Sequence, residues 1–337
     1  MSIQFFFVLL ALAWVLTWVL RAYALSRKII DVPNERSSHT TPTPRGGGVA
    51  IVITFLIAVL WLSAFHSLDF RLFAAIFGGG AAIAALGFLD DHGHIHAKWR
   101  LLCHFCIAGW VVACLGGFPP VVVFEYELDL GWAGSIFALL YLAWLTNLYN
   151  FMDGIDGIAS VEAITCCLGA CGIYYFVQMP ELMVLPLVLA AAVIGFLIWN
   201  FPPARIFMGD AGSGFLGLIL GAISINAAFS SFNLFYSWLI LLGVFVVDAT
   251  LTLARRLFRG EKVYEAHRSH AYQFAARRFG KHAPVTLGVL VINVVWLMPF
   301  AYMAAISALD GVVAVSIAYA PLVWLAIRYG AGTAEAR

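Results

Sequence analysis

Charged side chains are scarce in this chain. Only 11% of its 337 residues are Asp, Glu, Lys or Arg, whereas 63% are hydrophobic. A soluble globular domain usually carries roughly 25% charged residues, so the composition excludes an ordinary soluble protein. Internal repeats, low-complexity tracts and long soluble segments are also lacking. We therefore expect residues 1–337 to form a single integral membrane domain, whose surroundings are a lipid bilayer and whose partners include no nucleic acid.

Cysteine is sparse and confined to apolar stretches. Two of the cysteines, Cys103 and Cys106, have the spacing of a redox or metal pair, but cysteine is among the most buried residue types. We interpret all of them as small apolar side chains on helices, and no disulfide framework is predicted. The six positions are Cys103, Cys106, Cys114, Cys166, Cys167 and Cys171.

Long apolar runs make up most of the sequence. Runs of about 17–21 residues match the hydrocarbon thickness of a bilayer, and in lipid they form helices because a lone strand would leave its backbone groups unpaired. The sequence predicts an all-α polytopic membrane protein of about 11 transmembrane helices, the first of which is retained because no cleavage site follows it. The loop 118–130 is predicted to contain a small strand-like excursion. The expected spans are 3–20, 47–65, 70–88, 99–117, 131–149, 158–177, 182–199, 212–229, 234–254, 284–304 and 311–327.

The basic residues predict the orientation of these spans. Alternating spans divide the loops into two sets, and all of the 19 Lys and Arg residues except Arg71 fall in one set. The positive-inside rule assigns that set to the cytoplasm. The N-terminus is therefore predicted to be periplasmic and the C-terminus cytoplasmic. The same inner loops hold the polar motifs, so we expect the reactive side chains to converge on one membrane face.

One inner loop concentrates amides, carboxylates and glycines. It reads Asn147-Leu148-Tyr149-Asn150-Phe151-Met152-Asp153-Gly154-Ile155-Asp156-Gly157. Asn147, Asn150 and Asp153 are three residues apart, so the end of a helix would aim their oxygens in the same direction. A plain turn between two spans would not require this many polar side chains. Hard oxygen ligands at a bilayer surface suggest a divalent cation and a phosphate.

Two further inner loops are acidic. Asp90-Asp91 ends an apolar span, and two adjacent carboxylates at a membrane edge stay ionised only with cations nearby. Lys98 could supply one such cation or hold a substrate phosphate, whereas the alternative is a solvated helix end. Gly209-Asp210-Ala211-Gly212-Ser213 stands where a helix begins, and free backbone N–H groups there attract phosphate. Asp210 could reach a metal ion, or it could serve only as a helix cap.

The last polar motif is His267-Arg268-Ser269-His270, in the longest hydrophilic loop. An arginine between two histidines suits a diphosphate, because arginine forks onto phosphate oxygens. Contact with anionic lipid and a zinc pair are the alternatives. Asp248 lies inside the ninth span, and an intramembrane carboxylate is functional or tightly partnered. We expect it to be a structural partner near the site.

In this order the motifs resemble the polyprenyl-phosphate N-acetylhexosamine-1-phosphate transferase superfamily, the WecA- and MraY-like glycosyltransferase 4 family. The resemblance covers about residues 30–275. Eleven spans with an outer N-terminus are similar to the WecA branch rather than to the ten-span MraY pattern. The matching residues are Asp31-x-Pro33-Asn34-x-Arg36-Ser37-Ser38-His39, Pro42-Thr43-Pro44-Arg45-Gly46-Gly47, Asp90-Asp91 with Lys98, Asn147 to Gly157, Gly209 to Ser213, and the histidine loop.

The histidine loop departs from that pattern. WecA- and MraY-like members carry more histidines there, whereas His267-Arg268-Ser269-His270-Ala271-Tyr272-Gln273 resembles the WbpL-type enzymes that start O-antigen or related surface polysaccharides. The resemblance implies transfer of an N-acetylhexosamine-1-phosphate from a UDP-sugar to undecaprenyl phosphate, with release of UMP. It places the active site on the cytoplasmic face of a bacterial inner membrane. The sugar and the question of a homodimer stay open.

The resemblance also implies roles for the acidic residues. Asp210, with Asn150 or Asp153, would hold Mg²⁺, with Mn²⁺ as the alternative metal. Magnesium accepts few protein carboxylates beside substrate oxygens. The Asp90–Asp91 pair would deprotonate or orient the lipid phosphate, and Lys98 would hold a phosphate oxygen. A two-step route through an aspartyl-phosphate stays open.

The remaining motif residues are assigned to the nucleotide sugar. His267, Arg268 and His270 would bind the diphosphate and stabilise the leaving UMP. Asn147 and Asp156 would complete the nucleotide or metal shell, with Asp153 and Asp156 counted among the catalytic carboxylates. Two alternatives remain, a WecA-like enzyme that uses UDP-GlcNAc and a polytopic transporter. A transporter predicts polar sites at the bilayer midplane and often internal repeats.

Overall fold

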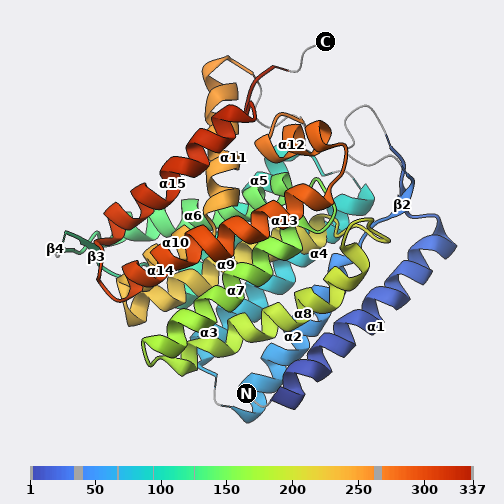
Figure 1. The fold of residues 1–337 in the computed structure, drawn as a ribbon. Helices are drawn as coiled ribbons and strands as arrows, with labels where there is room; N and C mark the ends of the chain where they lie inside the picture. Colours follow the sequence, from blue (N-terminus) through green and yellow to red (C-terminus); the bar gives the residue numbers. More distant parts are fainter. Residues whose placement is uncertain are drawn as a thin grey trace.

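Long apolar helices make up most of the chain in the computed structural model (Figure 1). The structure describes residues 3–33, 41–66, 68–93, 95–124, 126–261 and 268–334. Ten helices in these ranges are long and apolar enough to cross a membrane. They are α1 (Ile3–Arg27), α2 (Gly48–Phe65), Phe70–Gly93 (α3, η1 and α4), α5 (Ala97–Leu115), α6 (Trp132–Met152), α7 (Ile158–Phe176), Pro180–Asn200 (η2 and α8), α9 (Asp210–Ser230), Ala283–Ala305 (α13, η3 and α14) and α15 (Gly311–Arg328). Ten of the predicted spans are thereby confirmed.

The ninth predicted span, 234–254, is not one continuous helix. It is divided into α10 (Phe232–Leu241) and α11 (Gly243–Phe258), which meet at an angle of 71°. A Cβ atom on Gly243 would lie 2.9 Å from Tyr319 and 3.2 Å from Leu322. The chain therefore turns where α15 packs directly on its backbone. Counting this bent pair as one span gives eleven.

Short elements connect the spans. Two antiparallel hairpins pair β1 (Ile30–Asp31) with β2 (Thr43–Pro44), and β3 (Val121–Val123) with β4 (Tyr126–Leu128). The second hairpin confirms the strand-like excursion predicted for loop 118–130. The amphipathic helix α12 (Ala271–Phe279) follows α11. Figure 1 shows the two termini at opposite ends of the bundle, as an odd number of spans requires. Which end is cytoplasmic stays a prediction.

The helix α9 lies at the centre of the bundle, with 83% of its span window buried against 17% for α1. Glycine allows its neighbours to approach closely. A Cβ atom on Gly48 of α2 would lie 2.5 Å from the Cα atom of Gly212, and one on Gly87 of α4 would lie 2.5 Å from the carbonyl oxygen of Asp210. Backbone atoms cannot move away as a flexible side chain can. These crossings hold the N-terminus of α9, which begins at Asp210, against α2 and α4.

Candidate active site

Asp91 binds the N-terminus of α9. Its two carboxylate oxygens accept hydrogen bonds from the backbone N–H groups of Asp210, at 3.1 Å, and Ala211, at 3.3 Å. These are among the N–H groups that a helix cannot satisfy itself, and the helix dipole favours a negative charge there. Gly209 precedes the helix with φ 78°, and a Cβ atom on it would lie 2.8 Å from Asp91. The glycine therefore makes room for the carboxylate.

Arg45 joins Asp91 to Asp210. Its Nη2 atom lies 2.6 Å from an oxygen of each carboxylate. Burial lowers the pKa of Arg45, but the carboxylates of Asp210 and Asp91 outweigh that effect and the net pKa is raised. The backbone around Arg45 is held by hydrogen bonds, from Phe207 N–H to the Pro44 carbonyl at 2.8 Å and from Gly47 N–H to the Phe207 carbonyl at 2.9 Å. No role was predicted for Arg45, although its Pro-Arg-Gly-Gly context belongs to the matching motifs.

Asp90 is paired with Arg100. The two side chains approach to 2.7 Å, and Ile95 N–H donates a hydrogen bond to the other Asp90 oxygen at 2.8 Å. The side chain of Asp90 is only 7% exposed, so removal of this arginine would leave a buried carboxylate without a counter-charge. Arg100 also lies 3.9 Å from Asp210. The predicted cation, Lys98, is exposed, and no described carboxylate lies within ion-pair distance of it.

The residues of the Asn147–Gly157 stretch face different neighbours. Asn150 accepts a hydrogen bond from the Ser213 hydroxyl at 2.9 Å, which brings it to the first turn of α9. Asn147 donates to the Ala143 carbonyl within its own helix at 2.7 Å. Asp153 follows the last residue of α6 and is partly buried. Burial raises the pKa of Asp153 well above its usual range, and the nearby charges of Asp210, Asp156 and Asp91 add to the rise against the opposing effect of Arg45.

Asp156 lies in an adjoining cavity of about 460 Å³. One of its carboxylate oxygens is 3.1 Å from His282 Nδ1, and the other accepts a hydrogen bond from Ala204 N–H at 3.0 Å. Phe207, three residues before Asp210, also lines this cavity. His282 belongs to the start of α13, far along the chain, and no sequence signal connected it with Asp156.

The histidine loop is held by Asp248, the carboxylate in α11. Asp248 accepts hydrogen bonds from the backbone N–H groups of Ala271, at 2.9 Å, and Tyr272, at 3.0 Å, at the start of α12. His270 is 1% exposed, and its Nδ1 atom lies 3.4 Å from Asp248. The Tyr272 hydroxyl donates to the Phe151 carbonyl at 3.0 Å. Asp248 is thus a structural partner, and α12 packs on the stretch that carries Asp153.

The structure therefore gathers some predicted residues and not others. Asp90, Asp91, Asn150, Asp153 and Asp210 surround the N-terminus of α9. Asn147 and Asp156 lie beside this group. Lys98, two residues before Arg100 in the sequence, is exposed. Arg268 is partly buried and His270 is enclosed under α12. His267, like the predicted motif residues Asn34 to His39, lies outside the described residues.

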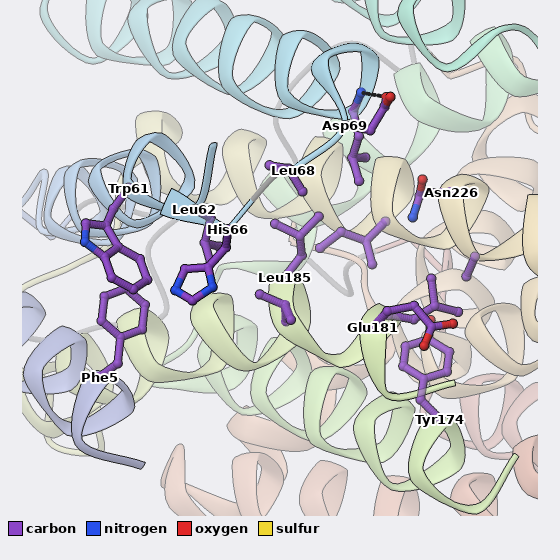
Figure 2. A pocket seen from close by; sticks show the side chains of 15 residues that line it. Phe5, Trp61, Leu62, His66, Leu68, Asp69, Tyr174, Glu181, Leu185 and Asn226 are labelled. Atoms are coloured by element: carbon purple, nitrogen blue, oxygen red, sulfur yellow. Dashed lines mark hydrogen bonds between the residues drawn. The ribbon is translucent and has the colours of Figure 1, made fainter. Parts of the chain in front are cut away.

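A second cavity, of about 490 Å³, lies elsewhere (Figure 2). It is lined by Phe5, Trp61 and His66, and also by Ala227 near the end of α9. The rings of Phe5 and Trp61 are stacked, with their centroids 4.4 Å apart. Ala227 is 17 residues from Asp210, or about 25 Å along a helix. Figure 2 shows mainly apolar side chains, with Glu181 and Asp69 apart from one another. This cavity does not belong to the carboxylate cluster.

The charges of the cluster fit a divalent cation. Four carboxylates (Asp90, Asp91, Asp153 and Asp210) face two guanidinium groups (Arg45 and Arg100), so full ionisation leaves two negative charges uncompensated. Burial is the largest cause of the raised pKa of Asp153, and the neighbouring carboxylates add to the rise. In the described part of the chain no three His, Cys, Asp or Glu side chains form a complete metal site. Magnesium commonly has such a sparse protein shell, because substrate phosphates and water supply its other ligands.

Comparison with known proteins identifies the family. Residues 73–228 match the family model described as glycosyl transferase family 4. The "Probable undecaprenyl-phosphate N-acetylglucosaminyl 1-phosphate transferase" of Bacillus subtilis is 30% identical over 271 residues, which cover 79% of this chain and 75% of the relative. The "Decaprenyl-phosphate N-acetylglucosaminephosphotransferase" of Mycolicibacterium smegmatis is 32% identical over 286 residues, with coverages of 76% and 70%. The "Phospho-N-acetylmuramoyl-pentapeptide-transferase" of Streptococcus pneumoniae is 31% identical over 262 residues, with coverages of 69% and 76%.

This similarity extends over most of the chain and includes the helices that carry Asp90, Asp91, Asn150 and Asp210. The many apolar spans agree with an enzyme embedded in a membrane. The chain therefore belongs to the glycosyl transferase family 4 of polyprenyl-phosphate N-acetylhexosamine-1-phosphate transferases and is an integral membrane phosphotransferase.

Proposed function

We propose that this protein transfers an N-acetylhexosamine-1-phosphate from a UDP-sugar to undecaprenyl phosphate on the cytoplasmic face of a bacterial inner membrane. The product, undecaprenyl-diphosphate-sugar, would begin the assembly of an O-antigen or related surface polysaccharide. The observation that carries the proposal is the meeting of Asp91, Arg45 and Asp210 at the N-terminus of α9. Fixed guanidinium groups beside carboxylates that can bind a metal ion are suited to a diphosphate.

The reaction joins two phosphates. An oxygen of the lipid phosphate attacks the β-phosphorus of the UDP-sugar, the bond between that phosphorus and the bridging oxygen breaks, and UMP leaves with the bridging oxygen. Phosphoryl transfer of this kind requires positioning and neutralisation of charge more than covalent help from the protein. Asp90 and Asp91 are held rigidly by Arg100 and Arg45. We propose that they orient the lipid phosphate or take up its proton, and that Lys98 holds a phosphate oxygen.

Mg²⁺ is the proposed cofactor. Asp210, with Asn150 or Asp153, would hold it, and their convergence on α9 supports this choice. When bound, the ion would neutralise charge on the diphosphate. Arg45 and Arg100 are the protein's own cations in this cluster.

The nucleotide half of the substrate is assigned to the cavity that contains Asp156. Its volume of about 460 Å³ falls within the range of small-molecule sites. Asp156 offers a hydrogen-bond acceptor and Phe207 an aromatic side chain, and Phe207 is close in sequence to Asp210. Arg268 and His267 are proposed to bind the diphosphate, and His270 to support that loop against Asp248.

Two observations bear on the identity of the sugar. The histidine loop resembles that of WbpL-type enzymes, whereas two of the relatives described above are named for N-acetylglucosamine. UDP-GlcNAc is therefore the second candidate donor.

The decisive experiment is an assay of the purified protein in detergent with undecaprenyl phosphate, Mg²⁺ and a panel of UDP-N-acetylhexosamines. We expect release of UMP and formation of the lipid-linked sugar with one or a few donors. UMP release must depend on the lipid phosphate. Absence of UMP with every donor, from a protein whose folding is verified, would refute the proposed transfer from a UDP-N-acetylhexosamine to undecaprenyl phosphate.

A further inference from the structure

Glu162 is a carboxylic acid buried inside the bundle, away from the carboxylate cluster. It lies in α7, is 0% exposed, and takes part in none of the proposed chemical steps. Asn293, which is 2% exposed, donates a hydrogen bond from Nδ2 to Glu162 Oε2 at 2.6 Å. Asn293 lies in the π-helical turn η3 (Ile292–Leu297), a kind of distortion that often occurs at functional sites.

Each member of this pair keeps one oxygen without a partner. Neither Glu162 Oε1 nor Asn293 Oδ1 has a hydrogen-bond partner among the described residues. Both atoms are acceptors when the carboxyl group is ionised, so they cannot bond to each other in that state. The nearby Tyr149 hydroxyl reaches neither, since it has no partner itself. A buried acceptor without a donor is costly and requires an explanation.

No positive charge compensates an ionised Glu162 in the part of the chain that is described. The amide of Asn293 and the backbone N–H of Phe245 in α11 face it, and the Phe245 N–H forms no hydrogen bond with Oε1. The titratable side chains facing it from α6, α7 and α15 are Tyr149, Cys166 and Tyr319, which are all neutral at neutral pH. An unpaired charge inside a membrane protein is strongly unfavourable.

We propose that Glu162 is protonated at neutral pH and forms a neutral acid–amide pair with Asn293 that clamps α13 and η3 onto α7. One proton on Oε1 removes the charge of Glu162. The hydroxyl group so formed donates a hydrogen bond to Asn293 Oδ1, so that both previously unpartnered oxygens gain a partner. Asn293 Nδ2 also donates to Thr165 Oγ1 at 2.7 Å, so the amide holds two side chains of α7.

The clamp has a counterpart nearer to the active site. There, Thr286 of α13 donates a hydrogen bond to the Asp156 carbonyl at 2.8 Å, and His282 contacts the Asp156 carboxylate at 3.1 Å. The two helices run in the same direction from this point, so they are fastened at two levels. Glu162 and Asn293 are therefore positioning residues for Asp156 and its cavity. This consequence for activity rests on the proposed function, whereas the protonation of Glu162 does not.

Infrared difference spectroscopy tests the proton directly. The spectrum of the wild-type protein minus that of Glu162→Gln, in lipid at neutral pH, should contain the C=O stretching band of a protonated carboxyl group. The band should shift when H₂O is replaced by D₂O. A difference spectrum that contains carboxylate bands and no band of a protonated carboxyl group would overturn the proposal, because it would show that Glu162 is ionised.

Activity tests the clamp. Glu162→Gln should keep kcat/KM within about twofold of wild type, because glutamine can form the same two hydrogen bonds with Asn293. Glu162→Leu and Asn293→Leu should lower kcat/KM on the order of tenfold, as expected for loss of a buried hydrogen-bonded pair. Ser160→Ala, which removes another buried hydroxyl from α7, is the matched control and should have no comparable effect. If Glu162→Gln lowered kcat/KM as much as Glu162→Leu does, the proposed clamp would be overturned.

The two proposals fail separately. A protonated-carboxyl band in a protein that uses no UDP-sugar would support the acid–amide pair and refute the proposed function. Robust UMP release without that band would refute the pair and leave the proposed function in place.

Discussion

The Nη2 atom of Arg45 lies 2.6 Å from Oδ1 of Asp210, although 165 residues separate them in the chain. The same nitrogen lies 2.6 Å from Asp91. One guanidinium group therefore compensates carboxylates from two different helices, α4 and α9. The arginine that compensates this carboxylate pair lies on a third segment of the chain, beside β2.

Replacing Arg45 tests this dependence. Arg45→Ala should lower kcat about 10²-fold, the loss typical of removing one fixed electrostatic contact at a reacting group. The kcat of Arg45→Lys should lie between those of wild type and Arg45→Ala, because lysine keeps the charge but loses the planar fork. Initial rates of UMP release measure the effect. Arg71→Ala, at the opposite end of the span that carries Asp91, is the matched control and should behave as wild type. A normal rate for Arg45→Ala would contradict the assignment.

Removal of divalent cations tests the proposed metal site. A chelator should abolish UMP release, and added Mg²⁺ should restore it. Asp210→Asn should reduce kcat by at least about 10²-fold and raise the Mg²⁺ concentration that gives half-maximal activity, because a neutral amide is a weaker ligand for a hard cation. Glu181→Gln removes an exposed acid outside the cluster and should change neither value. A folded Asp210→Asn protein with near-normal Mg²⁺-dependent turnover would exclude Asp210 as a ligand.

Loss of Arg100 should lower the stability of the protein, whereas loss of Lys98 should affect only the kinetics. Arg100→Ala leaves Asp90, 7% exposed, without its counter-charge, which should destabilise the protein by about 3–5 kcal/mol. It should also lower activity. Lys98→Ala should leave thermal unfolding unchanged because the side chain is exposed. If Lys98 holds a substrate phosphate as proposed, its loss should raise KM. Thermal unfolding in detergent together with steady-state kinetics separates the two, and unchanged kinetics for Lys98→Ala would remove that lysine from the site.

A single methyl group on α4 should disturb the site without altering any charge. In Gly87→Ala, the new Cβ atom would lie 2.5 Å from the Asp210 carbonyl oxygen and 2.6 Å from Ala211 N. Since both are backbone atoms, the N-terminus of α9 must shift, and a shift of about 1 Å can cost 10²-fold in rate. Gly93→Ala lies in the same helix with nothing within 4 Å of its Cβ position. If the kcat of Gly87→Ala equalled those of Gly93→Ala and wild type, this crossing would not position Asp210.

Several features could be predicted from the sequence. The spans followed from apolar length, and the loops that meet at Asp91, Asn150 and Asp210 followed from the clustering of polar residues between spans. Asp248 was correctly expected to be a structural partner, and it binds the start of α12. The bend inside the ninth span was not predicted, because hydropathy does not register the packing of α15 on Gly243.

The cations were the least predictable part of the site. Arg100 and Lys98 are two residues apart in a basic segment, and only the direction in which α5 leaves the membrane surface decides that Arg100 meets Asp90. Arg45 and His282 were counted as topology determinants or left without a role. Their partners come from distant segments, so no local pattern indicates them.

The sequence by itself determined that this chain crosses a membrane many times and carries its polar motifs in the loops between spans. This follows because the cost of burying an unpaired backbone group or a charge in lipid is decided within each segment. Only the tertiary structure decided which carboxylate meets which arginine, and which buried acid meets an amide. Those pairings depend on close helix crossings at residues such as Gly48 and Gly87, where the shape of two separate helices, and not the composition of either, sets the distance.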